Sequence, residues 1–285
     1  MDNRNRMNID EMSEFYYEDT FLQSDIGIYL TERLRKENWQ PERRKIAITK
    51  WDKLKPFAPD GNQYEDCEPT QLLDNDAHYV MRLVGEYYLA RAFNALKIDL
   101  SDVNVRVDAE TGNIGTCARI IKMWSGSNLD DTDELLSGRW NKSPRMASFD
   151  TTSDYDSPLW IKTQVRAVCS HHVIGFHDVP ADKDSFVVVG YIPENGKMGG
   201  ISKISRIVNY ASRRLWLQES LTEYIAKLVA ERFETTSVFV AMINISHGCS
   251  WTRGANDNEA RTTTFYSTGQ FKEDRSLIPE RFKGL

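Results

Sequence analysis

Residues 199–226 read GGISKISRIVNYASRRLWLQESLTEYIA, and this stretch decides the fold class of the chain. Its apolar residues recur every three or four positions, which is the spacing of one face of a helix. This apolar stripe comprises Ile204, Val208, Ala211 and Leu215, followed by Leu221 and Ile225 and, just beyond the quoted stretch, by Leu228 and Val229. The stretch therefore predicts a long helical pair whose apolar face covers another layer of the protein.

Four runs rich in β-branched and aromatic residues flank the helical pair and predict strands. Two precede it, at 158–168 and 185–192, and two follow it, at 237–245 and 261–268. The order of helices, strands, paired helices and strands is typical of an α+β fold. We therefore expect an antiparallel sheet with helices covering one side.

The chain before the first strand run is predicted to be helical or irregular. Helical periodicity covers about 74–96 and 115–125, whereas 126–156 is dense in Ser, Asp, Asn and Gly and predicts a long loop. These segments belong with the strands to one main domain, which we expect to cover residues 73–285.

Residues 1–72 differ from the rest in their high charge and their prolines, which include Pro41, Pro56, Pro59 and Pro69. We expect a helix over roughly 10–37 and irregular chain after it, because proline interrupts regular structure. The segment is interpreted as an N-terminal extension of unknown role.

The composition is typical of a globular protein that buries an ordinary core. Of the 285 residues, 40% are hydrophobic, and the formal net charge is −6. A negative surface does not attract a nucleic-acid backbone, so phosphate chemistry requires a local cluster of Lys and Arg. No run of about eighteen apolar residues could span a bilayer, and no signal peptide is evident. We therefore expect neither nucleic acid nor a membrane as a partner, and a cytoplasmic location.

Two segments carry residues that could bind a metal ion. The first is CSHH at 169–172, just after a predicted strand, and the second is HGC at 247–249, at the end of another. Thiolate and imidazole groups bind zinc tetrahedrally, and three protein ligands would leave the fourth position open to water. Buried free cysteines and a core histidine are the alternative interpretation, and spacing alone does not separate a ligand histidine from one that transfers protons. The other two cysteines, Cys67 and Cys117, are interpreted as structural thiols.

With these two motifs, the chain resembles GTP cyclohydrolase I over roughly residues 74–271. The resemblance rests on CSHH, on GYIP at 190–193, on the helical pair at 199–226 and on HGCSWTRG at 247–254, in the order of that family. A weaker match, GTCARIIKMW at 115–124, is similar to the start of the family's Thr-Pro-x-Arg helix.

The resemblance implies the tunnelling fold, in which a four-stranded antiparallel sheet with two helices on one face assembles with its copies into a closed oligomeric barrel. It also implies a homo-oligomer, a decamer of two pentamers, with each active site at a subunit boundary. One chain alone would then not complete its own pocket.

The resemblance also implies roles for individual residues. Cys169, His172 and Cys249 would bind Zn²⁺, and His171 and His247 would be the catalytic imidazoles. The remaining matched positions concern the substrate. Glu219, with Gln218 beside it, would hold the guanine, Ser202 would lie beside the ribose, and Lys203, Arg206, Arg253, Arg119 and Lys122 would grip the triphosphate. Without the resemblance, each residue has a structural interpretation. Glu219 could be an ordinary glutamate in the first turn of a helix, and Ser202 could be an N-cap. Lys203 and Arg206 could simply lie on a solvent-exposed helix face.

The implied reaction converts GTP and water to 7,8-dihydroneopterin triphosphate and formate. The chain departs from the family at Ser170, where the family has Glu, and at Cys117, where it has Pro. These departures keep two alternatives open: a paralogue that acts on another purine or pterin triphosphate, and a non-catalytic zinc-stabilised oligomer. A reductase of the same fold class is disfavoured, because its motif is not found and two metal-bound thiols would leave no nucleophile.

Overall fold

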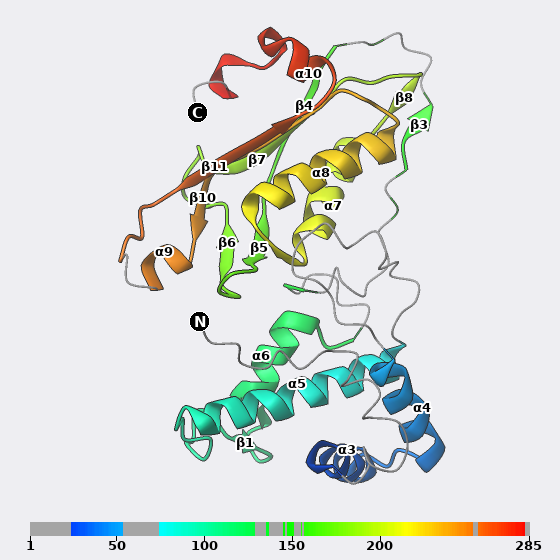
Figure 1. Ribbon diagram of the computed structural model, residues 1–285, viewed down its shortest axis with the longest axis vertical. Helices are drawn as coiled ribbons and strands as arrows, with labels where there is room; N and C mark the ends of the chain where they lie inside the picture. Colours follow the sequence, from blue (N-terminus) through cyan, green and yellow to red (C-terminus); the bar gives the residue numbers. More distant parts are fainter. Residues whose placement is uncertain are drawn as a thin grey trace, which may run out of the picture. The chain divides into compact units, whose positions relative to one another are not determined.

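The computed structural model describes residues 24–53, 74–128, 135–136, 145, 147–150, 155, 157–252 and 256–282. They divide into two compact units, which are described separately below (Figure 1). The first unit contains residues 24–53 and 74–123, and the second contains the described residues from Trp124 onward. No helix in this described part is both long and apolar enough to cross a membrane.

The first unit is helical, with one short hairpin. Its elements are α3 (Asp25–Lys36), α4 (Pro41–Asp52), α5 (Asn75–Ala95), β1 (Val107–Asp108), β2 (Asn113–Ile114) and α6 (Thr116–Ser125), whose last two residues fall in the second unit. The side chains of Ser24 and Asp74 accept hydrogen bonds from backbone N–H groups of α3 and α5, as N-caps do. Helices α5 and α6 lie where helical periodicity predicts them, at about 74–96 and 115–125.

Helix α4 contradicts the expectation of irregular chain after residue 37. Pro41 is its first residue, a position where the missing N–H costs nothing and the fixed φ suits the helix. Ala47 and Ile48 of α4 are buried in one cluster with Leu30 of α3 and Val80 of α5. The assignment of residues 1–72 to a separate extension remains a prediction.

The second unit is built on an antiparallel sheet, which confirms the α+β fold class. Its strands, in spatial order, are β4 (Leu159–Thr163), β7 (Phe186–Tyr191), β10 (Val238–His247) and β11 (Thr262–Ser267), one from each predicted run. Three shorter strands, β6 (Gly175–His177), β5 (Arg166–Cys169) and β9 (Leu215–Trp216), continue the sheet from the last two residues of β10. A separate two-stranded ribbon joins β3 (Phe149–Asp150) to β8 (Lys197–Met198).

One predicted strand, 158–168, is divided between two partners. Its first part is β4, paired with β7, and its second part is β5, paired with β6. The division falls at Val165, whose backbone N–H donates to the Asp178 carboxylate at 2.7 Å instead of to a strand. This contact spans 13 residues, so local sequence pattern does not reveal it.

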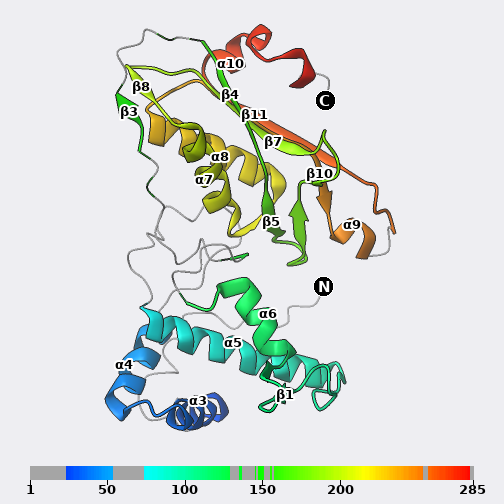
Figure 2. The same ribbon diagram turned by 180° about the vertical axis from the view of Figure 1, so that it is seen from behind.

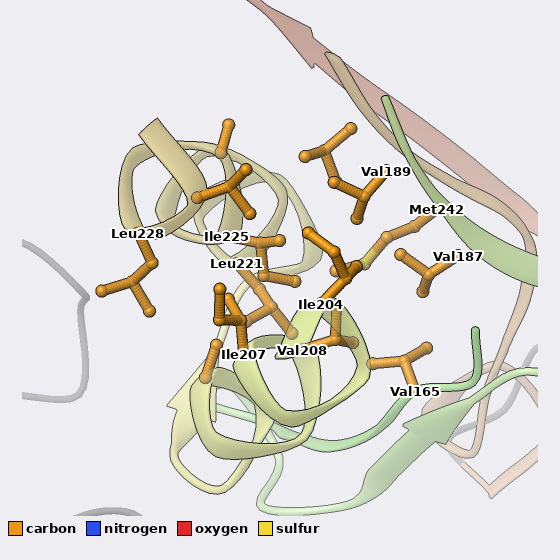
Figure 3. Packing of buried hydrophobic residues seen from close by; sticks show 14 of the residues in the cluster. Val165, Val187, Val189, Ile204, Ile207, Val208, Leu221, Ile225, Leu228 and Met242 are labelled. Atoms are coloured by element: carbon orange, nitrogen blue, oxygen red, sulfur yellow. The ribbon is translucent and has the colours of Figure 1, made fainter. Parts of the chain in front are cut away.

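Helices α7 (Ile201–Ser212) and α8 (Gln218–Phe233) lie together on one face of this sheet, as expected (Figures 1 and 2). Figure 3 shows Ile204 and Val208 of α7 and Leu221 of α8 packed toward Val187 and Met242 of the sheet; all of these side chains are buried. Leu215, which the apolar stripe assigned to the helical pair, instead lies in β9.

The opposite face of the sheet is covered by the C-terminal segment. Helix α10 (Gln270–Glu273) and the 3₁₀ helices η4 (Arg275–Leu277) and η5 (Glu280–Phe282) place Phe271, Ile278 and Phe282 against Val188 and Phe239. Because both faces are covered, the central strands β7 and β10 consist of nearly continuous apolar runs rather than alternating residues.

The packing of Gly190 on β7 gives a test of this sheet. A Cβ at this position would lie 2.4 Å from the nearest atom of the Trp160 ring, which is itself packed against Phe239. We expect Gly190→Ala to lower the free energy of unfolding by about 1–3 kcal/mol, the usual cost of overpacking. Urea denaturation measures the change. Gly175→Ala is the control, because its Cβ would meet only the Ala167 carbonyl at 3.8 Å, and an equal loss in both variants would contradict the prediction.

Candidate active site

The turn after β5 carries the first group of candidate residues. The Cys169 N–H donates to Ile174 O and the Cys169 carbonyl accepts from Val173 N–H, each at 2.9 Å, so a tight turn presents His171 and His172. Cys169 is 6% exposed, His172 is half-buried and His171 is exposed. Val173 has φ +55°, a left-handed conformation that is unfavourable for a β-branched residue and indicates local strain.

The end of β10 carries the second group, and β6 joins it to the first. Ser246 and His247 pair with His177 and Phe176 of β6, and Gly248 N–H then donates to Gly175 O at 3.0 Å. A Cβ on Gly248 would lie 2.5 Å from Ile174 Cγ2, so glycine allows the close approach. Cys249 follows as the first residue of α9 (Cys249–Thr252). The two cysteine-bearing segments therefore meet at the same end of β6.

Both cysteines are free thiols. Among the described residues, no three side chains of His, Cys, Asp or Glu are arranged so that they could hold a metal ion. The structure thus brings the backbone segments of Cys169, His172 and Cys249 to one corner without gathering their side chains. Their assignment as ligands remains a prediction.

His247 is held by two contacts. Its Nε2 lies 2.7 Å from Gln218 Oε1, and its ring stacks on Phe176 with centroids 4.7 Å apart and planes 5° apart. Burial lowers the pKa of His247, and the nearby Glu219 charge opposes this. Because Gln218 Oε1 can only accept, Nε2 carries the proton and Nδ1 of the neutral ring is free to accept one.

Gln218 is itself fixed from the other side by β11. Its Nε2 donates to Thr264 Oγ1 at 3.0 Å, and its Oε1 accepts from Thr262 Oγ1 at 2.9 Å. The side chain of Gln218 is buried, whereas Glu219, next to it in the first turn of α8, is exposed. No motif marks the two threonines in the sequence, although their spacing of two on a strand predicts a shared face.

The candidate phosphate residues of α7 lie on its exposed side. The N-cap of α7 is Gly200, so the interpretation of Ser202 as an N-cap is wrong; Ser202 is an exposed residue of the first turn. Lys203 Nζ donates to Arg145 O at 3.4 Å. Arg206 lines a cleft of about 680 Å³ in the second unit.

The same cleft contains two cations that the sequence analysis missed, Arg166 at the start of β5 and Arg213 just after α7. Arg213 is 2% exposed, and its Nε donates to Asn209 Oδ1 at 3.0 Å. Arg166 reaches this cleft through the packing of β5 beside α7, which no local motif reveals, whereas Arg213 lies two helical turns after Arg206 and shares its face of α7.

Each remaining candidate residue lies either in the first unit or outside the described residues. Arg119 and Lys122 are exposed on α6, and Arg119 Nη2 donates to Asn104 O at 3.0 Å. Cys117, the second residue of α6, is buried, and burial raises the pKa of its thiol. Arg253 and Cys67 lie outside the described residues.

Known proteins resemble this chain over the same region. A family model described as GTP cyclohydrolase I matches residues 104–285. A GTP cyclohydrolase 1 from Listeria monocytogenes serovar 1/2a is 32% identical over 190 residues, which are 66% of this chain and 90% of the relative. One from Streptococcus suis is 36% identical over 114 residues, 40% of this chain and 57% of the relative. Among solved structures, an archaeosine synthase QueF-Like in the apo form matches 40% of this chain and 94% of its own, with 18% identity and a TM-score of 0.29.

Proposed function

Because this chain belongs to the GTP cyclohydrolase I family, we propose that it hydrolyses GTP at C8 of the guanine and yields 7,8-dihydroneopterin triphosphate and formate. The observation that carries the proposal is the placement of His247. This imidazole is half-buried, Gln218 fixes its tautomer, and the charge of Glu219 acts on it. The next residue, Gly248, donates to Gly175 near the Cys169 turn.

A zinc ion fits the donor set of this corner. Two free thiols and one imidazole are ligands that zinc prefers, and the missing Cβ of Gly248 allows the two segments to approach. Cys169, His172 and Cys249 would hold the ion. When bound, it would lower the pKa of a water molecule toward neutrality and supply hydroxide.

The chain's own residues supply proton transfer and substrate positioning. His247 accepts or returns a proton at Nδ1, and the exposed His171 serves as the second imidazole. Glu219 accepts hydrogen bonds from N1–H and the exocyclic amine of guanine, a pair of donors that adenine lacks. Imidazole and carboxylate groups suit these two roles, and the partial burial of His247 suits proton transfer.

The triphosphate is the proposed ligand of the basic residues. Lys203, Arg206 and Arg253, with Arg119 and Lys122 of α6, match the family's phosphate positions, and guanidinium groups bind phosphate oxygens in pairs. Arg206 shares its cleft with two further arginines, which supports an anionic occupant.

Assembly into a tunnelling-fold barrel, with active sites at subunit boundaries of a decamer, is part of the proposal. In the described four-stranded part of the sheet β4 and β11 are the outer strands, and an edge strand offers backbone groups for pairing with another copy. A cytoplasmic location agrees with free thiols at Cys169 and Cys249.

The test is incubation of the zinc-loaded protein with GTP, followed by assay of formate and of the fluorescent pterin formed on oxidation. We expect both products, and His171→Ala should lower turnover by about a hundredfold or more while zinc content and assembly stay unchanged. Absence of both products with zinc bound would reject the GTP assignment.

The second candidate function is that of a paralogue that acts on another purine or pterin triphosphate. Ser170, at the position of the family's Glu, favours this alternative. Other purine and pterin triphosphates would then be tried as substrates.

A further inference from the structure

The first unit contains a cavity that the proposed function does not use. Its volume is about 590 Å³, within the usual range for small-molecule sites. Helices α3 and α5, the β1–β2 hairpin and α6 supply its walls, so the cavity lies wholly within one compact unit.

Positive charge dominates the lining of this cavity. Arg33 and Lys36 of α3 and Arg82 of α5 are its cations, and Glu86 and Asp108 are its acidic residues. Burial raises the pKa of Glu86, so its carboxyl is the less inclined to carry charge. Asp108 pairs with Arg106 at 3.6 Å, and Arg33 pairs with Glu37 at 3.5 Å. Outside these two ion pairs the lining carries Lys36 and Arg82 against Glu86, and this excess of positive charge favours an anionic ligand.

The cavity also presents flat aromatic surfaces. Tyr29 and Tyr79 line it, and each ring is supported by a second one: Tyr87 lies 5.1 Å from Tyr29, and Trp39 stacks on Tyr79 at 5.7 Å. The Tyr79 hydroxyl is fixed by donating to Glu37 Oε1 at 2.6 Å. Leu83 and Ile121 add apolar surface. Such a lining suits a planar ring, because aromatic side chains stack on the faces of nucleobases.

We infer that this cavity binds a nucleotide, that is, a flat nitrogen heterocycle joined to a phosphate. The phosphate would lie against Arg33, Lys36 and Arg82, and the ring against Tyr29 and Tyr79. Inorganic phosphate would meet the cations but leave most of the volume unfilled. An uncharged aromatic molecule would leave the cations without a ligand. Only a ligand with both parts matches both surfaces.

The lining of the cavity contains none of the residues proposed for substrate binding or catalysis. Ala118 and Ile121 of α6 line it, whereas Arg119 and Lys122 of the same helix do not. Glu219 and His247 belong to the second unit. Binding here can therefore be measured separately from binding of the substrate.

The test uses AMP as the probe on the full chain, because the proposed guanine contact at Glu219 gives adenine no matching donors. Isothermal titration should show saturable AMP binding, and the double variant Arg33→Gln with Lys36→Gln should weaken it at least about tenfold, since contacts from charged donors are the strong ones. The matched control, Arg35→Gln with Lys45→Gln, removes the same charge from exposed positions of α3 and α4 outside the cavity and should leave the affinity unchanged.

Three results would overturn the inference. One is failure of AMP to saturate the protein at millimolar concentration. Another is weakening by Glu219→Gln but not by the cavity variant, since AMP would then occupy the substrate site. The third is binding of inorganic phosphate as tightly as AMP, which would leave the aromatic surfaces without a role. Because none of these results depends on turnover of GTP, the inference can fail while the proposed function stands.

Discussion

Alanine at position 249 should leave the chain folded but unable to retain zinc, and GTP turnover should fall by about 10³-fold or more. Cys249 is one of three proposed ligands, and two ligands rarely hold this ion against competing water. A bound metal ion contributes several kcal/mol to charge stabilisation, and each 1.36 kcal/mol corresponds to a factor of ten in rate. Elemental analysis after dialysis measures the zinc, and formate release measures turnover.

Cys117→Ala is the matched control for this prediction. Cys117 is also a free thiol and is buried, but it lies in the first unit and is not a proposed ligand. It should keep the full zinc content and near-normal turnover. Retention of one zinc ion per chain by the Cys249→Ala protein would remove Cys249 from the ligand set. Circular dichroism of both variants separates loss of metal from loss of fold.

Replacement of Glu219 by glutamine should lower kcat/KM for GTP by about 10²- to 10⁴-fold. The carboxylate is proposed to accept two hydrogen bonds from guanine, and hydrogen bonds to a charged group contribute about 1.5–3 kcal/mol each. Glutamine keeps the shape but turns one acceptor into a donor that faces the donors of the base. Steady-state kinetics with GTP measures the change, and zinc content should not alter.

Glu223→Gln provides the control, because Glu223 lies one turn further along α8 and pairs at the surface with Lys227 at 3.0 Å. Its replacement should change kcat/KM by less than about twofold, since exposed ion pairs contribute little. Equal losses in the two variants would indicate a general effect on α8 and would contradict the role proposed for Glu219.

The parts of the fold that depend on local pattern could be predicted from the sequence. Ile204 and Val208 recur at helical spacing because α7 buries one face, and the apolar run around Val188 is a strand because both of its faces are covered. The errors arose where a distant contact decides. The backbone N–H of Val165 donates to the Asp178 carboxylate rather than to a neighbouring strand. Leu215 pairs with Val168 of β5 rather than continuing a helix. Pro41 was read as an interruption although it begins α4.

The candidate site was predictable to a similar degree. The motifs identified His247, Gln218 and Glu219, which the structure brings together at the start of α8 and the end of β10. Motifs did not identify Thr264, which fixes Gln218, because its role arises from the pairing of β10 with β11. Arg166 of β5 was missed for a related reason, because tertiary packing brings it to the cleft of Arg206; Arg213, by contrast, could have been found from its helical spacing to Arg206.

Strand β6 has a consequence for the thermodynamics of the whole second unit. It holds together two cysteine-bearing segments that lie about 80 residues apart in the chain, and a metal ion shared by them would act as a reversible cross-link. In the chain-entropy treatment, closing a loop of that length disfavours the unfolded ensemble by about 4.5 kcal/mol. The intervening chain contains α7, α8 and most of the sheet. Metal binding and folding of the second unit would then be linked, so that tighter binding of the metal would make the folded state more stable and its unfolding more cooperative.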